Sequence, residues 1–239
     1  MSQVATPITL ADTDTRNAYL LRVALMAAAG ISVSAVVGTL SALTIAAFPN
    51  LFMGRMMQLI VIFGSIAIAN YAARPLAFSQ STAVALGGFG LGAVFQGIAM
   101  GYILLMGWLM GMGAMGNGLF FIGQAFGMVV LAVVGMVLYL STGPREFSML
   151  RAGLAMLMLP MFALMALSFA FPGFFTGGLG LGLCVVFVLV SAAGLLVQVN
   201  DVMHRYRTDM VIAGSYSIMM GVLILFWNLL SLLMHLGDR

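Results

Sequence analysis

Long apolar segments dominate this chain of 239 residues and decide what it can fold into. A helix that crosses the hydrocarbon core of a bilayer needs about 20 mostly apolar residues. The sequence holds seven such runs: Val23–Phe48, Met56–Ala73, Thr82–Leu105, Leu119–Leu140, Ala152–Phe171, Leu179–Val199 and Met210–His235. We therefore expect an all-α polytopic membrane protein, a bundle of seven transmembrane helices.

The scarcity of charge excludes the main soluble classes. Charged residues make up 6% of the chain, against about 25% in an ordinary soluble domain. So few charges cannot cover the surface of a soluble fold, which excludes a water-soluble enzyme, a nucleic-acid-binding domain and a disordered chain. The nine basic residues are all arginines and lie mostly at the ends of apolar runs, which is typical of a topology signal.

The distribution of arginine predicts the orientation in the membrane. Seven arginines fall on the side of the bundle that carries the N-terminus, and two, Arg55 and Arg239, fall on the other. Because cytoplasmic loops carry the excess of basic residues, we expect a cytoplasmic N-terminus and, after seven crossings, an external C-terminus. Residues 1–17 are expected to form a polar tail and residues 18–239 one membrane domain, in the cell (inner) membrane.

Glycine is frequent in and after the third run. The glycines of the third run either loosen a helix or line a tight interface between helices. The stretch after it, Met106–Gly118, is expected to form an apolar loop. The pairs Gly97/Gly101 and Gly123/Gly127 match the small-xxx-small spacing that lets membrane helices approach closely. The Gly-rich stretches lie within or beside spanning runs, without the strand and distant acidic residue of a dinucleotide site, so nucleotide binding is not expected.

Catalytic and metal-binding patterns are absent from the sequence. The two histidines, His204 and His235, end different runs near opposite faces, and the single cysteine, Cys184, lies within an apolar run. There is no HExxH motif, no Cys/His cluster and no acidic residue in the middle of a run. We therefore expect neither an enzyme nor a bound metal or cofactor.

Polar side chains within or at the ends of the runs are the candidate functional residues. Each buried amide must find a hydrogen-bond partner between helices or water in a cavity, so these amides hold helices together or line a path. Asp201 is expected in a loop beside Arg205 and Arg207, and Arg151 is expected to be a loop charge. The candidates for a polar seam or gate are Arg74, Asp201, Gln198, Asn70 and Asn200.

The serial order of segments resembles the Bax inhibitor family, also called the transmembrane Bax inhibitor motif family, as a divergent member of bacterial, YccA-like type. The end of the span Leu119–Leu140 carries Tyr139, followed by Ser141 and Thr142, and leads into a loop of basic, acidic, Phe and Ser residues over 145–148, as in that family. The opening helix, Asn17–Gly38, and the closing helix, Gly214–Gly237, are also similar to those of the family. The likeness covers nearly the whole chain.

The resemblance implies a seven-helix bundle with a calcium leak, gated by pH through two membrane aspartates and an arginine. The arginine falls on Arg74, and the second aspartate falls on Gly221. The first falls on Gln198 or Val199, and Asp201 matches it only with a small gap. At most one acidic residue of the pair therefore survives, and a lone carboxylate beside an arginine stays ionised near neutral pH. We expect that any leak is not gated by this pair.

Two functions remain open. The first is a channel-like cation (calcium) leak, which predicts that several of the five candidate residues face one cavity. The second is a non-conducting regulatory or interaction protein that binds a membrane protease, as FtsH is bound by bacterial relatives of the YccA type, or another membrane complex. It predicts a closed, dry bundle with a face of small residues left free for a partner.

Overall fold

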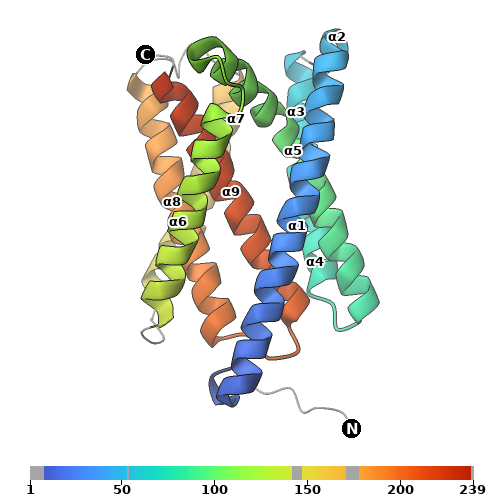
Figure 1. Ribbon diagram of the computed structural model, residues 1–239, viewed down its shortest axis with the longest axis vertical. Helices are drawn as coiled ribbons and strands as arrows, with labels where there is room; N and C mark the ends of the chain where they lie inside the picture. The colour runs from blue at the N-terminus through green and yellow to red at the C-terminus, as the bar shows by residue number, and fades with distance from the viewer. Residues whose placement is uncertain (1–7, 53, 142–146, 171–177, 238–239) are drawn as a thin grey trace.

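The computed structural model describes residues 8–52, 54–141, 147–170 and 178–237. Within these ranges every regular element is a helix, and the helices pack side by side in one bundle (Figure 1). In chain order the elements are the 3₁₀ helix η1 (Ile8–Leu10), α1 (Thr13–Ala47), α2 (Pro49–Phe52), α3 (Arg55–Ala67), the π-helix η2 (Ile68–Ala73), α4 (Arg74–Ala77), α5 (Thr82–Met115), α6 (Phe120–Ser141), α7 (Ser148–Ala170), α8 (Gly178–His204) and α9 (Val211–Gly237).

The expectation of an all-α membrane protein is confirmed. Among the described residues, six helical segments are long and apolar enough to span a bilayer. The remaining predicted run, Ala152–Phe171, falls on α7, of which only Ser148–Leu157 counts as a described apolar segment. The number of seven crossings and the orientation stay predictions. In Figure 1, α1 begins and α9 ends at opposite ends of the bundle, as an odd number of crossings requires.

The first helix begins ten residues before the predicted apolar run, inside the expected polar tail. The Asp12 carboxylate accepts a hydrogen bond from the Thr15 backbone N–H at 3.2 Å and so caps the helix. Hydrogen bonding from the Thr15 side chain, and then from its backbone N–H, holds the pKa of Asp12 below its ordinary value. Ahead of the cap, Ile8 is fully buried and its N–H donates to the Tyr206 carbonyl at 3.1 Å. Residues 1–7 lie outside the described part of the tail.

The second run forms one continuous rod of three elements, α3, η2 and α4. Pro75 has no N–H and its ring crowds the carbonyl four residues earlier, so an unbroken α-helix is unfavourable here. A π-helical turn absorbs the mismatch: the Arg74 N–H donates to the Ala69 carbonyl, five residues back. The buried hydroxyl of Tyr216 on α9 donates to the same carbonyl. This contact joins the irregular turn to α9.

The predicted loop over Met106–Gly118 is wrong, because α5 continues to Met115. A bilayer offers no water to pair exposed backbone groups, so a helix is favoured even through a glycine-rich stretch. The helix ends at Gly116, whose φ of 65° is left-handed and suits glycine. Its N–H donates back to the carbonyls of Gly111 and Met112, which closes the last turn.

Of the two readings of the glycine-rich third run, the structure supports the tight interface. A Cβ at Gly97 would lie 2.7 Å from the Ser34 carbonyl of α1, and one at Gly92 would overlap the Tyr216 ring of α9. The Ser34 hydroxyl donates to the Ala93 carbonyl at 2.8 Å, where the two backbones come close. The pair Gly97/Gly101 therefore packs α5 onto α1 as expected. In contrast, a Cβ added at Gly123 or Gly127 on α6 would meet no atom of another described element within 4 Å.

The closing helix α9 occupies the middle of the bundle. It contacts α1, α4, α5, α6 and α8, and its inward side chains are almost fully enclosed. Leu195 of α8 and Leu225 of α9 pack in one cluster, while Phe89 of α5 and Met219 of α9 pack in another. The position of α9 therefore sets which residues of α8 and α5 meet at the centre.

Replacing Gly97 with alanine is expected to destabilise the protein by about 1–3 kcal/mol, because the new methyl group meets the backbone of α1. The matched control is Gly87→Ala on the same helix, where nothing lies within 4 Å of the new methyl group. Thermal unfolding of the detergent-solubilised protein, followed by size-exclusion chromatography, measures both. Equal stability of the two variants would contradict the packing of α5 on α1.

Candidate functional site

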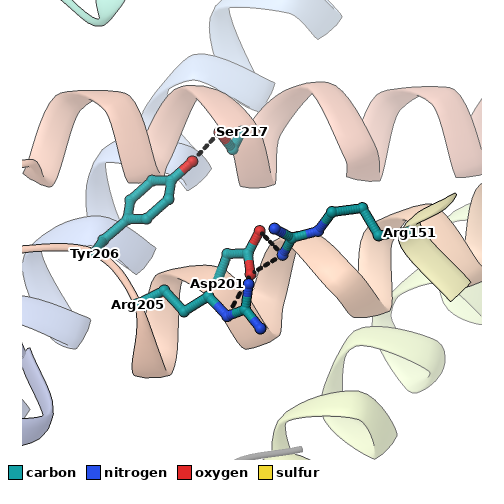
Figure 2. A network of polar contacts seen from close by, with 5 residues as sticks. All are labelled: Arg151, Asp201, Arg205, Tyr206 and Ser217. Carbon is teal, nitrogen blue, oxygen red and sulfur yellow. Dashed lines mark hydrogen bonds and ion pairs between the residues drawn. The ribbon is translucent and has the colours of Figure 1, made fainter. Parts of the chain in front are cut away.

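Asp201 lies within the last turns of α8, not in a loop as expected, and forms the centre of an ion-pair network (Figure 2). Its two carboxylate oxygens accept hydrogen bonds from Arg151 Nη2 at 2.5 and 2.7 Å. Arg205 Nε lies 3.6 Å from one of the same oxygens. The Asp201 side chain is 19% exposed, against 45% for Arg151, so the carboxylate is the more enclosed partner.

The expectation that Arg151 is a loop charge is wrong. It is the fourth residue of α7, and its backbone N–H donates to the Phe147 carbonyl at 2.8 Å. Its bonds to Asp201 place its side chain beside α8. Arg207, the other expected partner of Asp201, pairs with Asp209 at 3.1 Å instead. Arginine at the start of an apolar run commonly anchors a helix at the membrane surface, and that signal could have located Arg151 on α7. Residues 142–146 of the family-like loop lie outside the described ranges.

Arg74 is exposed and separate from this network. Its guanidinium lies 5.8 Å from the centre of the Phe78 ring, and among the described residues it forms no ion pair with an acidic side chain. Phe78 packs edge-on against Tyr206, with ring centres 6.4 Å apart. The Tyr206 hydroxyl lies 3.3 Å from Ser217 Oγ, as Figure 2 shows. Aromatic packing, not charge, links the Arg74 end of the rod to the α8–α9 loop.

Gln198 lies one turn before Asp201 and faces α9. A side chain added at Gly221 would overlap the Gln198 amide oxygen and the Leu195 side chain. That amide oxygen is buried and has no hydrogen-bond partner within the described structure. The two positions onto which the resemblance places the acid pair, Gln198 and Gly221, are therefore in contact. The sequence left open whether Gln198 or Asp201 stands opposite Gly221, and the geometry selects Gln198.

The two remaining candidates do not extend this contact into a seam. Asn70 donates to the Ile66 carbonyl of its own helical rod at 2.9 Å. Asn200 is 1% exposed, enclosed in α8 on a different face from Gln198 and Asp201. The five predicted seam residues thus fall into two separate groups: Asn70 and Arg74 lie one turn apart on the α3–η2–α4 rod, and Gln198, Asn200 and Asp201 lie on α8, with Asn200 on a different face from the other two.

Two cavities lie between the helices of the described structure, and none of the five candidates lines either of these two. The larger, about 440 Å³, lies between α3, α5, α7, α8 and the C-terminal half of α9. Its polar lining includes Gln58, Asn228 and Ser231. The smaller, about 340 Å³, lies mainly between α1 and α3 and is mostly apolar. The cavities and the Asp201 network are therefore separate features.

Comparison with known proteins identifies the family. No curated protein and no solved structure matches the chain. A family model described as "Inhibitor of apoptosis-promoting Bax1" matches residues 16–238, from the start of α1 to the end of α9. This range includes α2 to α9 and all but the first three residues of α1, together with the Gln198–Gly221 contact and the Asp201 network. The chain is thus a multi-pass membrane protein that belongs to the Bax inhibitor family.

Proposed function

We propose that this protein acts by binding and regulating another membrane protein in the cell (inner) membrane, without enzymatic activity and without a pH-gated calcium leak. The observation that carries the proposal is the contact between Gln198 and Gly221. The family resemblance implies two aspartates at this contact, and this chain has an amide and a glycine there.

A pH gate of this kind depends on two carboxylates held close together. Their mutual repulsion raises one pKa into the range where a change of pH switches its charge. Gln198 does not titrate, and Gly221 has no side chain. Asp201 is one turn away and is held between Arg151 and Arg205. The groups needed for a proton switch at this position are missing.

The packing around the contact supports a closed bundle. Leu195 and Leu225, on the two helices that carry Gln198 and Gly221, are 0% and 1% exposed. None of the five seam residues lines either of the two cavities described above. An ion in a dry, apolar bundle meets a high desolvation cost.

A free face on α6 supports a partner within the membrane. A Cβ added at Gly123, Gly127 or Gly135 would meet no atom of another described element within 4 Å, while Phe126 and Leu131 beside them are exposed. Small residues let the backbone of a second helix approach closely. The partner that fits this face is a transmembrane helix of another protein, and an FtsH-like membrane protease is the candidate that the resemblance implies.

The second candidate function is a calcium leak with a different gate. It is favoured by the cavity of about 440 Å³, whose polar side chains Gln58, Asn228 and Ser231 lie near one end of the bundle. A path from this cavity would have to pass the packed side chains around Gln198.

Calcium flux into liposomes distinguishes the two functions. We expect vesicles that contain the protein to take up no more calcium than protein-free vesicles between about pH 6 and 8, because the titrating pair is absent. An ionophore added at the end of each run verifies that the vesicles are sealed. Protein-dependent uptake would favour the leak, and a transition in that uptake with pH would refute the loss of the gate.

Substitution on α6 tests the partner. Gly127→Leu fills the open face and is expected to reduce copurification of the membrane protease while leaving thermal stability unchanged, because a Cβ at this position meets no other described part of the chain within 4 Å. Met128→Leu, at the exposed neighbouring position, is the matched control. Equal recovery of the protease with both variants would remove α6 as the docking face.

A further inference from the structure

The larger cavity contains neutral polar side chains that the proposed function does not use. Gln58 of α3 and Trp227 and Asn228 of α9 line it. Within the described residues, neither the two side-chain amides nor the indole N–H forms a hydrogen bond. The amide of Asn70, by comparison, donates to a carbonyl of its own helical rod at 2.9 Å. Three polar groups from two helices are therefore available to a molecule in the cavity.

The rest of the cavity lining is mostly apolar. Ile62, Ile103, Leu183 and Phe187 contribute aliphatic and aromatic surface, and the described lining residues include no Asp, Glu, Lys or Arg. A charged molecule would lose its hydration here without gaining an opposite charge, which is unfavourable. Water alone would pair the amides but leave the apolar side chains hydrated. The lining thus fits an uncharged molecule that is polar at one end and apolar at the other.

The polar part of the lining lies toward the surface of the bundle. Gln58 is the fourth residue of α3, and Asn228, Ser231 and His235 follow one another at intervals of three and four residues on one face of α9. His235 is exposed, so the cavity reaches the surface there. Among the described helices, α3 packs on α5 and α8 packs on α9, and the cavity separates α3 from α8. An apolar molecule in the bilayer therefore has a route between α3 and α8.

We propose that this cavity binds an uncharged lipid whose polar end carries carbonyl oxygens, as a diacylglycerol or a quinone does. Gln58, Trp227 and Asn228 each present an N–H donor, for which a carbonyl oxygen is the matching acceptor. The cavity volume of about 440 Å³ lies within the range of about 300–1,000 Å³ that is typical of ligand sites. The carbonyl end and the first part of the apolar chain fill the cavity, and the rest of the chain lies in the bilayer. This inference does not depend on whether the protein conducts ions or binds a protease.

Tryptophan fluorescence tests the proposal, because the chain has two tryptophans and Trp227 lines the cavity whereas Trp108 does not. Trp108→Phe leaves Trp227 as the reporter. Trp227→Phe leaves Trp108, which is 44% exposed, as the matched control. The full-length protein in detergent would be titrated with a short-chain ubiquinone and, separately, with a diacylglycerol that carries bromine on its acyl chains, since both probes quench tryptophan. We expect saturable quenching of Trp227 by at least one probe, which identifies the kind of lipid, and no saturable quenching of Trp108.

Removal of both amides tests the hydrogen bonds. In the Trp108→Phe background, the double variant Gln58→Leu/Asn228→Leu is expected to bind the quenching probe about tenfold more weakly, as the loss of two neutral hydrogen bonds predicts. Gln124→Leu is the matched control, because it removes an exposed amide on α6 that does not line the cavity. It should bind the probe as its parent does. Size-exclusion chromatography of each variant verifies its fold.

A charged lipid tests the requirement for neutrality. Phosphatidic acid with the same brominated acyl chains is expected to bind at least tenfold more weakly than the neutral probe, because its phosphate meets no basic side chain in the described lining. The proposal is overturned if neither neutral probe quenches Trp227 saturably, if phosphatidic acid binds as tightly as the neutral probe, or if the double variant binds like its parent.

Discussion

The close contact of α5 with its neighbours through glycine is the interaction on which the rest of the bundle depends. In a bilayer, lipid tails are as apolar as leucine, so helices gain little by leaving them and associate by close packing and hydrogen bonds instead. Gly97 meets the backbone of α1, and Gly92 meets Tyr216 of α9. The Ser34 and Tyr216 hydroxyls then donate to the carbonyls of Ala93 and Ala69. These contacts fix α1 and α9 relative to α5.

The position of α9 in turn determines the chemistry of the centre. It places Gly221 against Gln198, so the contact for which the family resemblance implies two acids contains none here. The nearest carboxylate, Asp201, lies at the next turn of α8 and joins α8 to α7 through Arg151. Where the family resemblance implies a proton switch made of two carboxylates, this chain has the neutral residues Gln198 and Gly221. The remaining carboxylate, Asp201, connects α7 to α8 through its ion pair with Arg151. The neutral contact at Gln198–Gly221 and the helix-joining ion pair of Asp201 support a structural and interaction role over ion conduction.

Apolar runs predicted the helices well because about 20 apolar residues have few alternatives to crossing a membrane. The apolar runs failed to predict that Met106–Met115 is helical. In water, glycine-rich segments commonly form loops, but in a bilayer the backbone groups must be hydrogen-bonded within the segment, which favours a helix. Composition also cannot reveal which residues of one helix lie opposite which residues of its neighbour. Gln198 and Asp201 lie three residues apart on one helix, so they share nearly the same face and differ by about 60° and about 4.5 Å along the axis. Only the packing of α8 on α9 decides which of them lies against Gly221. The partnership of Arg151 with Asp201, fifty residues apart, was missed for the same reason.

Thiol cross-linking between α8 and α9 tests the central claim most directly. In a Cys184→Ala background, the pair Gln198→Cys/Gly221→Cys would be compared with Asp201→Cys/Gly221→Cys, using a short bifunctional thiol reagent on the protein in membranes. The account predicts efficient cross-linking of the first pair and little of the second. Preferential cross-linking of the second pair would place an acidic residue opposite Gly221 and contradict the loss of a titrating group at the centre of the bundle.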